Sequence, residues 1–196
     1  FLRNLASIVA GYFKVRGISS VISTACAGGN YAISYAFDLI RNGVLDSALA
    51  GSSDCLSKAS FFGFNRLYAM APKICQPFDK NRKGMLMGEG SATIFLERLD
   101  SALKRGANIY AEILGYGLSC DAHSLAIPKQ EGIERAISKA LVSSGVNTNQ
   151  VDYISAHGTG TYANDKAECA AIKQVFGKRH NKIPVSSIKS MIGHAM

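Results

Sequence analysis

The chain has 196 residues, of which 47% are hydrophobic and 18% are charged, and its formal net charge is +8. A charged fraction below the usual quarter indicates that much of the chain is buried in a core or an interface. No apolar run is long enough to span a membrane. The basic residues are spread along the chain without interleaved aromatics, which argues against nucleic acid and leaves an acidic protein as the better partner.

Cysteine usage points to a reducing compartment. The five cysteines are odd in number and contain no CxxC pair, so neither a disulfide framework nor a zinc site is expected. The amphipathic start of the chain lacks a signal-peptide cleavage pattern. We therefore expect a cytoplasmic globular protein.

The hydrophobic pattern alternates between helical and strand periodicity. Helices are predicted over residues 1–16, 27–41, 99–105, 131–144 and from Asn164 or Asp165, as the cap, to 176. Strands are predicted over residues 18–24, 47–51, 91–97, 109–118, 151–156 and 183–187. Residues 53–90 are richer in Gly, Pro and Asn and are expected to be looser. Short apolar strands between helices indicate an α/β fold with a parallel or mixed sheet covered on both faces.

The stretch VISTACAGGN, residues 21–30, places Cys26 between a predicted strand and a predicted helix. Unpaired N–H groups at a helix N-terminus favour an anion such as a thiolate. The small residues around Cys26 would let a substrate carbonyl approach the sulfur. The sequence therefore suggests a nucleophile, although a buried structural cysteine is the open alternative.

Two more strand ends carry ionisable side chains. His157 follows a predicted strand and enters the glycine- and threonine-rich segment HGTGT, while Lys189 and His194 follow the last predicted strand. Ligand sites in α/β proteins gather at the carboxyl ends of strands. Taken singly, the histidine could be satisfied within a tight turn and the lysine could be solvated. Together with Cys26 they form a more specific set.

Two carboxylates, Asp165 and Glu168, lie three residues apart on one face of the helix that follows His157. A carboxylate there could complement the helix N-terminus, or it could hold Lys189 in place.

Four motifs together resemble the β-ketoacyl-acyl-carrier-protein synthases, the elongating condensing enzymes of fatty acid and polyketide synthesis. They read TACAGG, PFDKNRKGMLMGEGSA, AHGTGTYANDKAE and SSIKSMIGHA. The resemblance implies a thiolase-like fold of two similar αβα halves with mixed sheets between helices, incomplete in this chain. Residues 1–106 would be the later part of the N-terminal half, with the nucleophile. Residues 107–196 would be the first part of the C-terminal half, with two histidines.

The resemblance also implies the site. Cys26 would be the nucleophile, His157 and His194 the histidine pair, and Lys189 and Glu168 an accessory charged pair. Thr159 and Thr161 would bind substrate. The implied reaction is decarboxylative Claisen condensation, in which an acyl-cysteine intermediate is attacked by a malonyl unit that has lost carbon dioxide. Neither a metal nor another cofactor is implied.

The implied partners follow from that chemistry. Acyl and malonyl groups would arrive on the phosphopantetheine arm of an acidic acyl carrier protein, attracted by the basic surface. A homodimer or a heterodimer with a homologue is expected. Since relatives carry further segments at both ends, the chain is expected to be an excerpt or to fold with another chain, and to be poorly soluble alone.

Four other readings compete with this one. A non-catalytic, chain-length-factor-like homologue would pair with an active synthase, but such subunits lack the nucleophile. A degradative or biosynthetic thiolase would use a second catalytic cysteine where this chain has His194. Initiating condensing enzymes have Cys-His-Asn, and a papain-like protease would leave the HGTGT and GHA motifs without a role.

Overall fold

A computed structural model describes residues 5–124 and 126–196. The chain forms two compact units: residues up to 53 together with 91–110, and residues 54–90 together with 111–196. The predicted division into halves at residue 106 stays a prediction. In the described ranges, every helix is too short or too polar to cross a bilayer.

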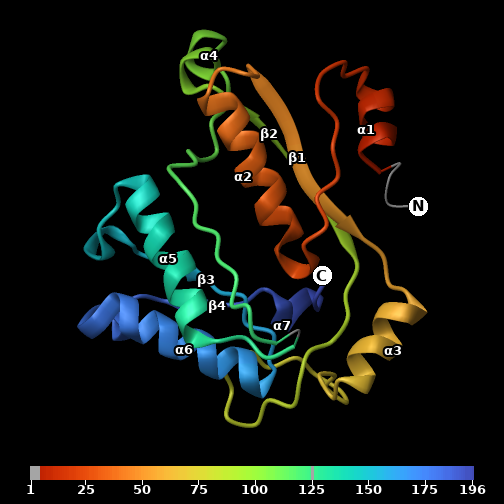
Figure 1. Ribbon diagram of the computed structural model, residues 1–196, viewed down its shortest axis with the longest axis vertical. Helices are drawn as coiled ribbons and strands as arrows, with labels where there is room; N and C mark the ends of the chain where they lie inside the picture. Colours follow the sequence, from red (N-terminus) through yellow and green to blue (C-terminus); the bar gives the residue numbers. More distant parts are fainter. Residues whose placement is uncertain (1–4, 125) are drawn as a thin grey trace. The chain divides into compact units, whose positions relative to one another are not determined.

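The first unit combines three helices with a two-stranded sheet (Figure 1). In chain order these elements are α1 (Leu5–Phe13), α2 (Gly28–Arg41), β1 (Ser47–Asp54), β2 (Gly90–Glu97) and α4 (Leu99–Lys104). Strands β1 and β2 pair with each other, and α2 runs alongside β1. Gly29 eases this approach, because a Cβ there would lie 3.2 Å from the Ser52 hydroxyl, which would then have to shift slightly. The absence of a side chain at Gly29 thus lets the start of α2 lie close to β1.

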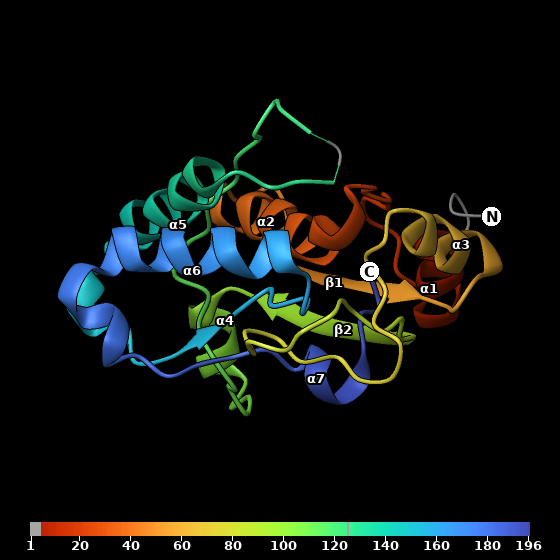
Figure 2. The same cartoon turned by 90° about the horizontal axis from the view of Figure 1, so that it is seen from below.

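The second unit contains four helices and a short parallel sheet. Its elements are α3 (Lys58–Arg66), α5 (Gln130–Ser144), β3 (Ile154–Ser155), α6 (Tyr162–Phe176), β4 (Val185–Ser186) and α7 (Lys189–Ile192), with 3-10 turns η3 (Thr148–Gln150) and η4 (Gly177–Asn181). Helices α5 and α6 pack side by side (Figure 2). The buried core consists of Ile172 and Phe176 of α6 with Ile183, and Ile137 of α5 packs against it.

The parallel pairing of β3 and β4 positions the candidate site. Ile154 pairs with Val185, and Ser155 pairs with Ser186. Because parallel strands end at the same edge, the segments that follow both strands leave the sheet together. One segment carries His157 and the other carries Lys189 and His194.

Five predicted helices are present, and the ends that the structure describes are shifted by up to a few residues. The first four residues of the helix predicted over 1–16 lie outside the described residues. The predicted strands over 18–24 and 109–118 are not formed, since neither segment joins a ladder in the described part of the chain. A strand is stable only when its backbone groups pair with a neighbour. Helix α3 was missed in the segment expected to be loose.

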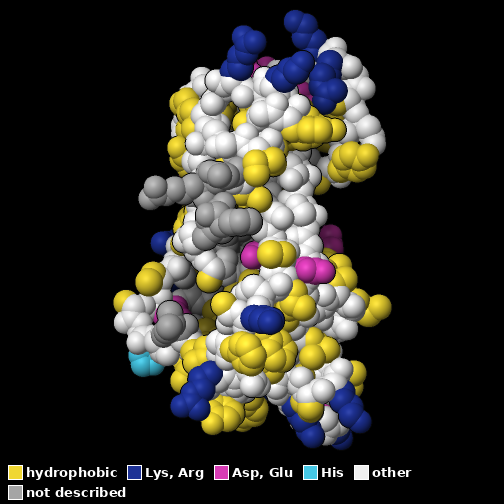
Figure 3. Space-filling view, turned by 90° about the vertical axis from the view of Figure 1, so that its right-hand side faces the viewer, with side chains coloured by type: hydrophobic (Ala, Val, Ile, Leu, Met, Phe, Trp, Pro, Cys, Tyr) yellow, Lys and Arg dark blue, Asp and Glu magenta, His cyan; other side chains and the backbone are white. Residues whose placement is uncertain are grey.

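Large hydrophobic side chains are exposed in both units, including Tyr12 (81%), Tyr68 (88%) and Met191 (83%). Figure 3 shows hydrophobic side chains at the surface. The low charge content of the sequence is thus accompanied by apolar surface as well as by a core.

Candidate active site

Cys26 lies where the sequence predicted it, directly before a helix. It is the middle residue of the 3-10 turn η2 (Ala25–Ala27), which leads without a break into α2. Ala25 has a φ of +48°, a left-handed conformation that is strained for a residue with a Cβ. The turn exposes Cys26 to solvent. A strained turn that presents an exposed thiol at the start of a helix suits a nucleophile.

Glu168 holds the backbone that carries His157. The two Glu168 carboxylate oxygens accept hydrogen bonds from the N–H groups of His157 and Gly158, at 2.6 and 2.8 Å. The Asn164 amide donates to the same carboxylate at 3.3 Å. Glu168 is buried, and hydrogen bonds to a charged acceptor are among the stronger ones in proteins. Glu168, one of the two carboxylates whose role the sequence left open, thus binds the peptide N–H groups of the histidine loop.

The segment after β4 binds the same loop from its carbonyl side. Lys189 Nζ donates to the His157 carbonyl oxygen at 2.6 Å. The Ser187 hydroxyl donates to the Gly158 carbonyl oxygen at 2.7 Å, and Ser187 is buried. Lys189 and Glu168 therefore fix both polar edges of one short turn. Ser187 was missed by sequence reasoning, although a small polar residue at a strand end was a usable signal.

His194 is held by its own backbone. Its N–H donates to the Leu86 carbonyl at 2.8 Å, and its carbonyl accepts from Gly88 N–H at 2.9 Å. Gly88 is required here, because a Cβ at that position would lie 2.3 Å from the carbonyl oxygen of Ile192 in α7. The motif around Gly88 thereby sets the position of His194, which is buried.

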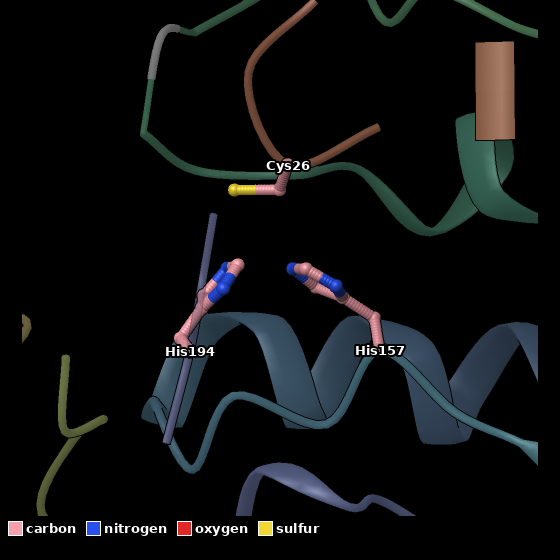
Figure 4. Close-up of side chains that lie close together, drawn as sticks. All are labelled: Cys26, His157 and His194. Atoms are coloured by element: carbon pink, nitrogen blue, oxygen red, sulfur yellow. The ribbon is translucent and has the colours of Figure 1, made fainter. Parts of the chain in front are cut away.

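The imidazole rings of His157 and His194 lie close together in an edge-to-face arrangement. Their centroids are 5.4 Å apart and their planes make an angle of 83° (Figure 4). Burial lowers the pKa of His157 to about 4, with a further contribution from the nearby Lys189 ammonium. The His157 side chain is accessible to solvent, although desolvation is the main cause of its lowered pKa. Burial, followed by His157 and Lys189, also lowers the pKa of His194 to about 4. Both rings are therefore neutral at neutral pH.

The hydrogen bond to His194 Nδ1 fixes its tautomer. The backbone N–H of Met196 donates to Nδ1 at 2.9 Å, so this nitrogen acts as an acceptor. A neutral imidazole carries one proton, which must then be on Nε2. His194 consequently offers an N–H donor rather than a base at Nε2.

The two predicted substrate-binding threonines contact each other. Thr159 Oγ1 and Thr161 Oγ1 are 2.8 Å apart, and the Thr161 N–H donates to Thr159 Oγ1 at 3.4 Å. Thr159 is buried, whereas Thr161 is half-buried. Their role in binding substrate stays a prediction.

The predicted cap of α6 is wrong. The helix begins at Tyr162, with Thr161 at the N-cap position, and Asp165 lies inside the first turn. The Asp165 side chain bonds instead to the N–H groups of Gly160 and Phe78, at 3.2 and 2.7 Å. Phe78 is distant in sequence, so local capping rules could not reveal this use of the carboxylate.

The neutral histidines predict how stability depends on pH. Between about 4 and 6.5 the folded state binds fewer protons at His157 and His194 than the unfolded state does, because both pKa values are lowered. The free energy of unfolding should therefore fall as the pH drops through this window. Replacing both histidines by Gln should flatten the dependence of the thermal midpoint on pH, measured by circular dichroism from pH 7 to 4.

The exposed His123 provides the matched control for that experiment. His123→Gln should leave the slope of the thermal midpoint against pH unchanged. An unaltered slope in the double variant would contradict the lowered pKa values.

Comparison with known proteins first identifies the class. The chain superposes on the ishigamide ketosynthase/chain length factor structure with a TM-score of 0.96 and 45% identity, covering 100% of this chain and 48% of that one. A β-ketoacyl synthase from Burkholderia phymatum superposes with a TM-score of 0.92 and 37% sequence identity. The match covers 96% of this chain and 47% of that one. The fold is therefore the thiolase-like fold of the ketosynthases.

Two family models then match nearly the whole chain. The β-ketoacyl synthase N-terminal domain matches residues 3–102, and the β-ketoacyl synthase C-terminal domain matches residues 110–196. The chain belongs to the β-ketoacyl synthase family, as the four motifs predicted.

Curated relatives come from both nodulation and fatty acid synthesis. Nodulation protein E of Rhizobium leguminosarum bv. trifolii is 42% identical over 99% of this chain and 50% of its own length. The 3-oxoacyl-[acyl-carrier-protein] synthase 2 of Synechocystis sp. is 42% identical over 100% of this chain and 49% of its own length. The chain thus spans about half the length of the curated relatives it matches.

Proposed function

We propose that this chain carries the nucleophile and the histidine pair of a condensing enzyme that elongates acyl chains. The observation that carries the proposal is the edge-to-face pair of neutral imidazoles of His157 and His194. His194 presents its Nε2–H as a donor. Two neutral N–H donors suit an oxygen that gains negative charge, because they stabilise it without transferring a proton.

The reaction divides between the two kinds of residue. The Cys26 thiolate attacks the carbonyl carbon of an acyl thioester, the carrier leaves as its thiolate, and an acyl-cysteine forms. A malonyl thioester then loses carbon dioxide, and its electron pair passes into an enolate whose oxygen accepts hydrogen bonds from His157 and His194. The enolate carbon attacks the acyl-cysteine carbonyl, which forms the new carbon–carbon bond and releases the Cys26 thiolate.

The proposed substrates are acyl and malonyl groups on an acidic acyl carrier protein. The formal net charge of +8 favours approach of such a partner. One similar structure is described as a type II acyl carrier protein in complex with its ketosynthase, with 37% identity and a TM-score of 0.94 over 97% of this chain and 49% of that one. A homologous second subunit is also proposed.

The proposal is tested by product analysis. The protein at its full natural length is incubated with two carrier protein samples together, one loaded with hexanoyl groups and the other with malonyl groups. The masses of the carrier proteins are then measured. We expect a 3-oxoacyl carrier that is two carbons longer than the acyl donor, together with one carbon dioxide per product. Folded protein that gives no product with hexanoyl, octanoyl or decanoyl carriers would favour the non-catalytic, chain-length-factor-like alternative.

A further inference from the structure

Arg82 joins two loops of the second unit, the loop that contains residues 78–84 and the threonine loop of residues 159–162. Its Nη1 donates to the Asp79 carbonyl at 2.9 Å, within its own loop. Its Nη2 donates to the Tyr162 carbonyl at 3.3 Å, and its Nε donates to the Thr161 carbonyl at 3.4 Å. One guanidinium thereby connects both loops.

Asp165 completes this connection. Its Oδ2 lies 3.5 Å from Arg82 Nε, and the two side chains are only 1% and 13% exposed. The same carboxylate accepts the N–H groups of Phe78 and Gly160, one from each loop. A further backbone bond runs from Gly84 N–H to the Gly160 carbonyl at 3.0 Å. Because the ion pair is buried, removing one partner would leave an uncompensated charge.

A cavity lies beside Arg82 along the first turns of α6. It has a volume of about 480 Å³ and is bordered by Phe78, Arg82, Tyr162, Asp165 and Lys166. The Tyr162 ring lies 5.1 Å from the Arg82 guanidinium carbon and is otherwise 70% exposed. The exposed Tyr162 side chain would not replace the hydrogen bonds of the Arg82 guanidinium if they were lost.

We propose that Arg82 is a positioning residue that fixes Thr161 and, through Asp165, the turn at Gly160, so that the paired threonine hydroxyls are held ready for the pantetheine arm. This inference rests on the proposed function. The first half of the same loop is anchored directly by Glu168 at His157 and Gly158, and the Asn164 amide links the Glu168 and Asp165 carboxylates. A change at Arg82 should therefore disturb substrate binding more than the chemistry at the histidines.

Arg82→Lys tests this separation in the full-length protein. Lysine keeps the charge near Asp165, but its single ammonium cannot reproduce the planar set of bonds to two carbonyls and a carboxylate. We expect KM for malonyl carrier protein to rise about tenfold, equivalent to one charge-assisted hydrogen bond, with kcat changed by less than about threefold. Alkylation of Cys26 by iodoacetamide, followed by the mass of the peptide that contains Cys26, should keep its wild-type rate.

Arg98→Lys is the matched control, because Arg98 pairs with the exposed Asp100 in the first unit. It should leave both kinetic constants unchanged. If Arg82→Lys fails to fold, Asp165→Asn, which removes the charge but keeps the shape, is measured in the same way and should raise KM.

The outcomes separate this inference from the proposed function. An inactive wild-type protein contradicts the proposed function, whatever the variants do. An active wild type whose Arg82→Lys variant loses kcat at unchanged KM, or retains both constants, overturns the positioning role alone.

Discussion

Cys26→Ala is expected to lose acyl transfer entirely within the sensitivity of intact-mass detection. The wild-type protein, incubated with a hexanoyl-pantetheine thioester, should gain the mass of one hexanoyl group. The variant should gain none, and condensation should fall by a factor on the order of 10³ or more, because the covalent intermediate has no attachment point. Alanine fits the turn, since Ala25 and Ala27 flank the position.

The four other cysteines serve as internal controls for this experiment. Cys55→Ala and Cys120→Ala change exposed thiols and should keep the adduct. Digestion and fragment masses then locate the acyl group on one peptide. An adduct that persists in Cys26→Ala would place the nucleophile elsewhere and contradict the assignment.

His194→Ala and His157→Ala should separate acylation from decarboxylation. Each variant should still form the acyl-cysteine, yet release of carbon dioxide from malonyl carrier protein should fall by about 10²- to 10³-fold, the usual effect of removing one donor to a developing oxyanion. The release is measured with isotopically labelled malonyl groups. Because the backbone contacts at position 157 do not involve the ring, the thermal midpoint of His157→Ala should shift little. His194→Ala should lower it, since this change removes a buried ring that accepts a hydrogen bond from the Met196 N–H.

Loss of the acyl adduct in both histidine variants would contradict this division of labour. It would indicate that the imidazoles act as bases towards the thiol instead of as donors towards an enolate. His123→Ala, at an exposed position, is the control that should leave both half-reactions unchanged.

Local patterns predicted the helices well and the strands less well. The helix from Gln130 to Ser144 follows from apolar spacing and ends at Gly145, as predicted. The predicted strand over residues 18–24 depended on a pairing partner, and the local pattern cannot supply one. Helix α3 was missed because Gly63 and Asn65 interrupt its pattern, whereas a Ser57 cap, accepting from Ser60 N–H at 3.1 Å, favours it.

The residue types of the site and their places at strand ends could be predicted from the sequence. The hydrogen bonds that connect these residues to distant loops could not. The sequence placed Cys26, His157 and His194 at turns, where the structure has them. It could not show that Asp165 reaches Phe78 across 87 positions of the chain, or that Arg82 binds Thr161 across 79 positions. Such long-range bonds depend on how loops fold back, which no local periodicity encodes.

The Glu168 anchor has a consequence for engineering. The Glu168 carboxylate accepts hydrogen bonds from main-chain N–H groups, so the backbone conformation at position 157 does not depend on these bonds reaching the side chain. Different groups, such as an amide, a thiol or a non-natural imidazole analogue, could be installed there without rebuilding the turn. Position 157 is therefore a suitable place to introduce a different functional group, provided that Glu168 is kept.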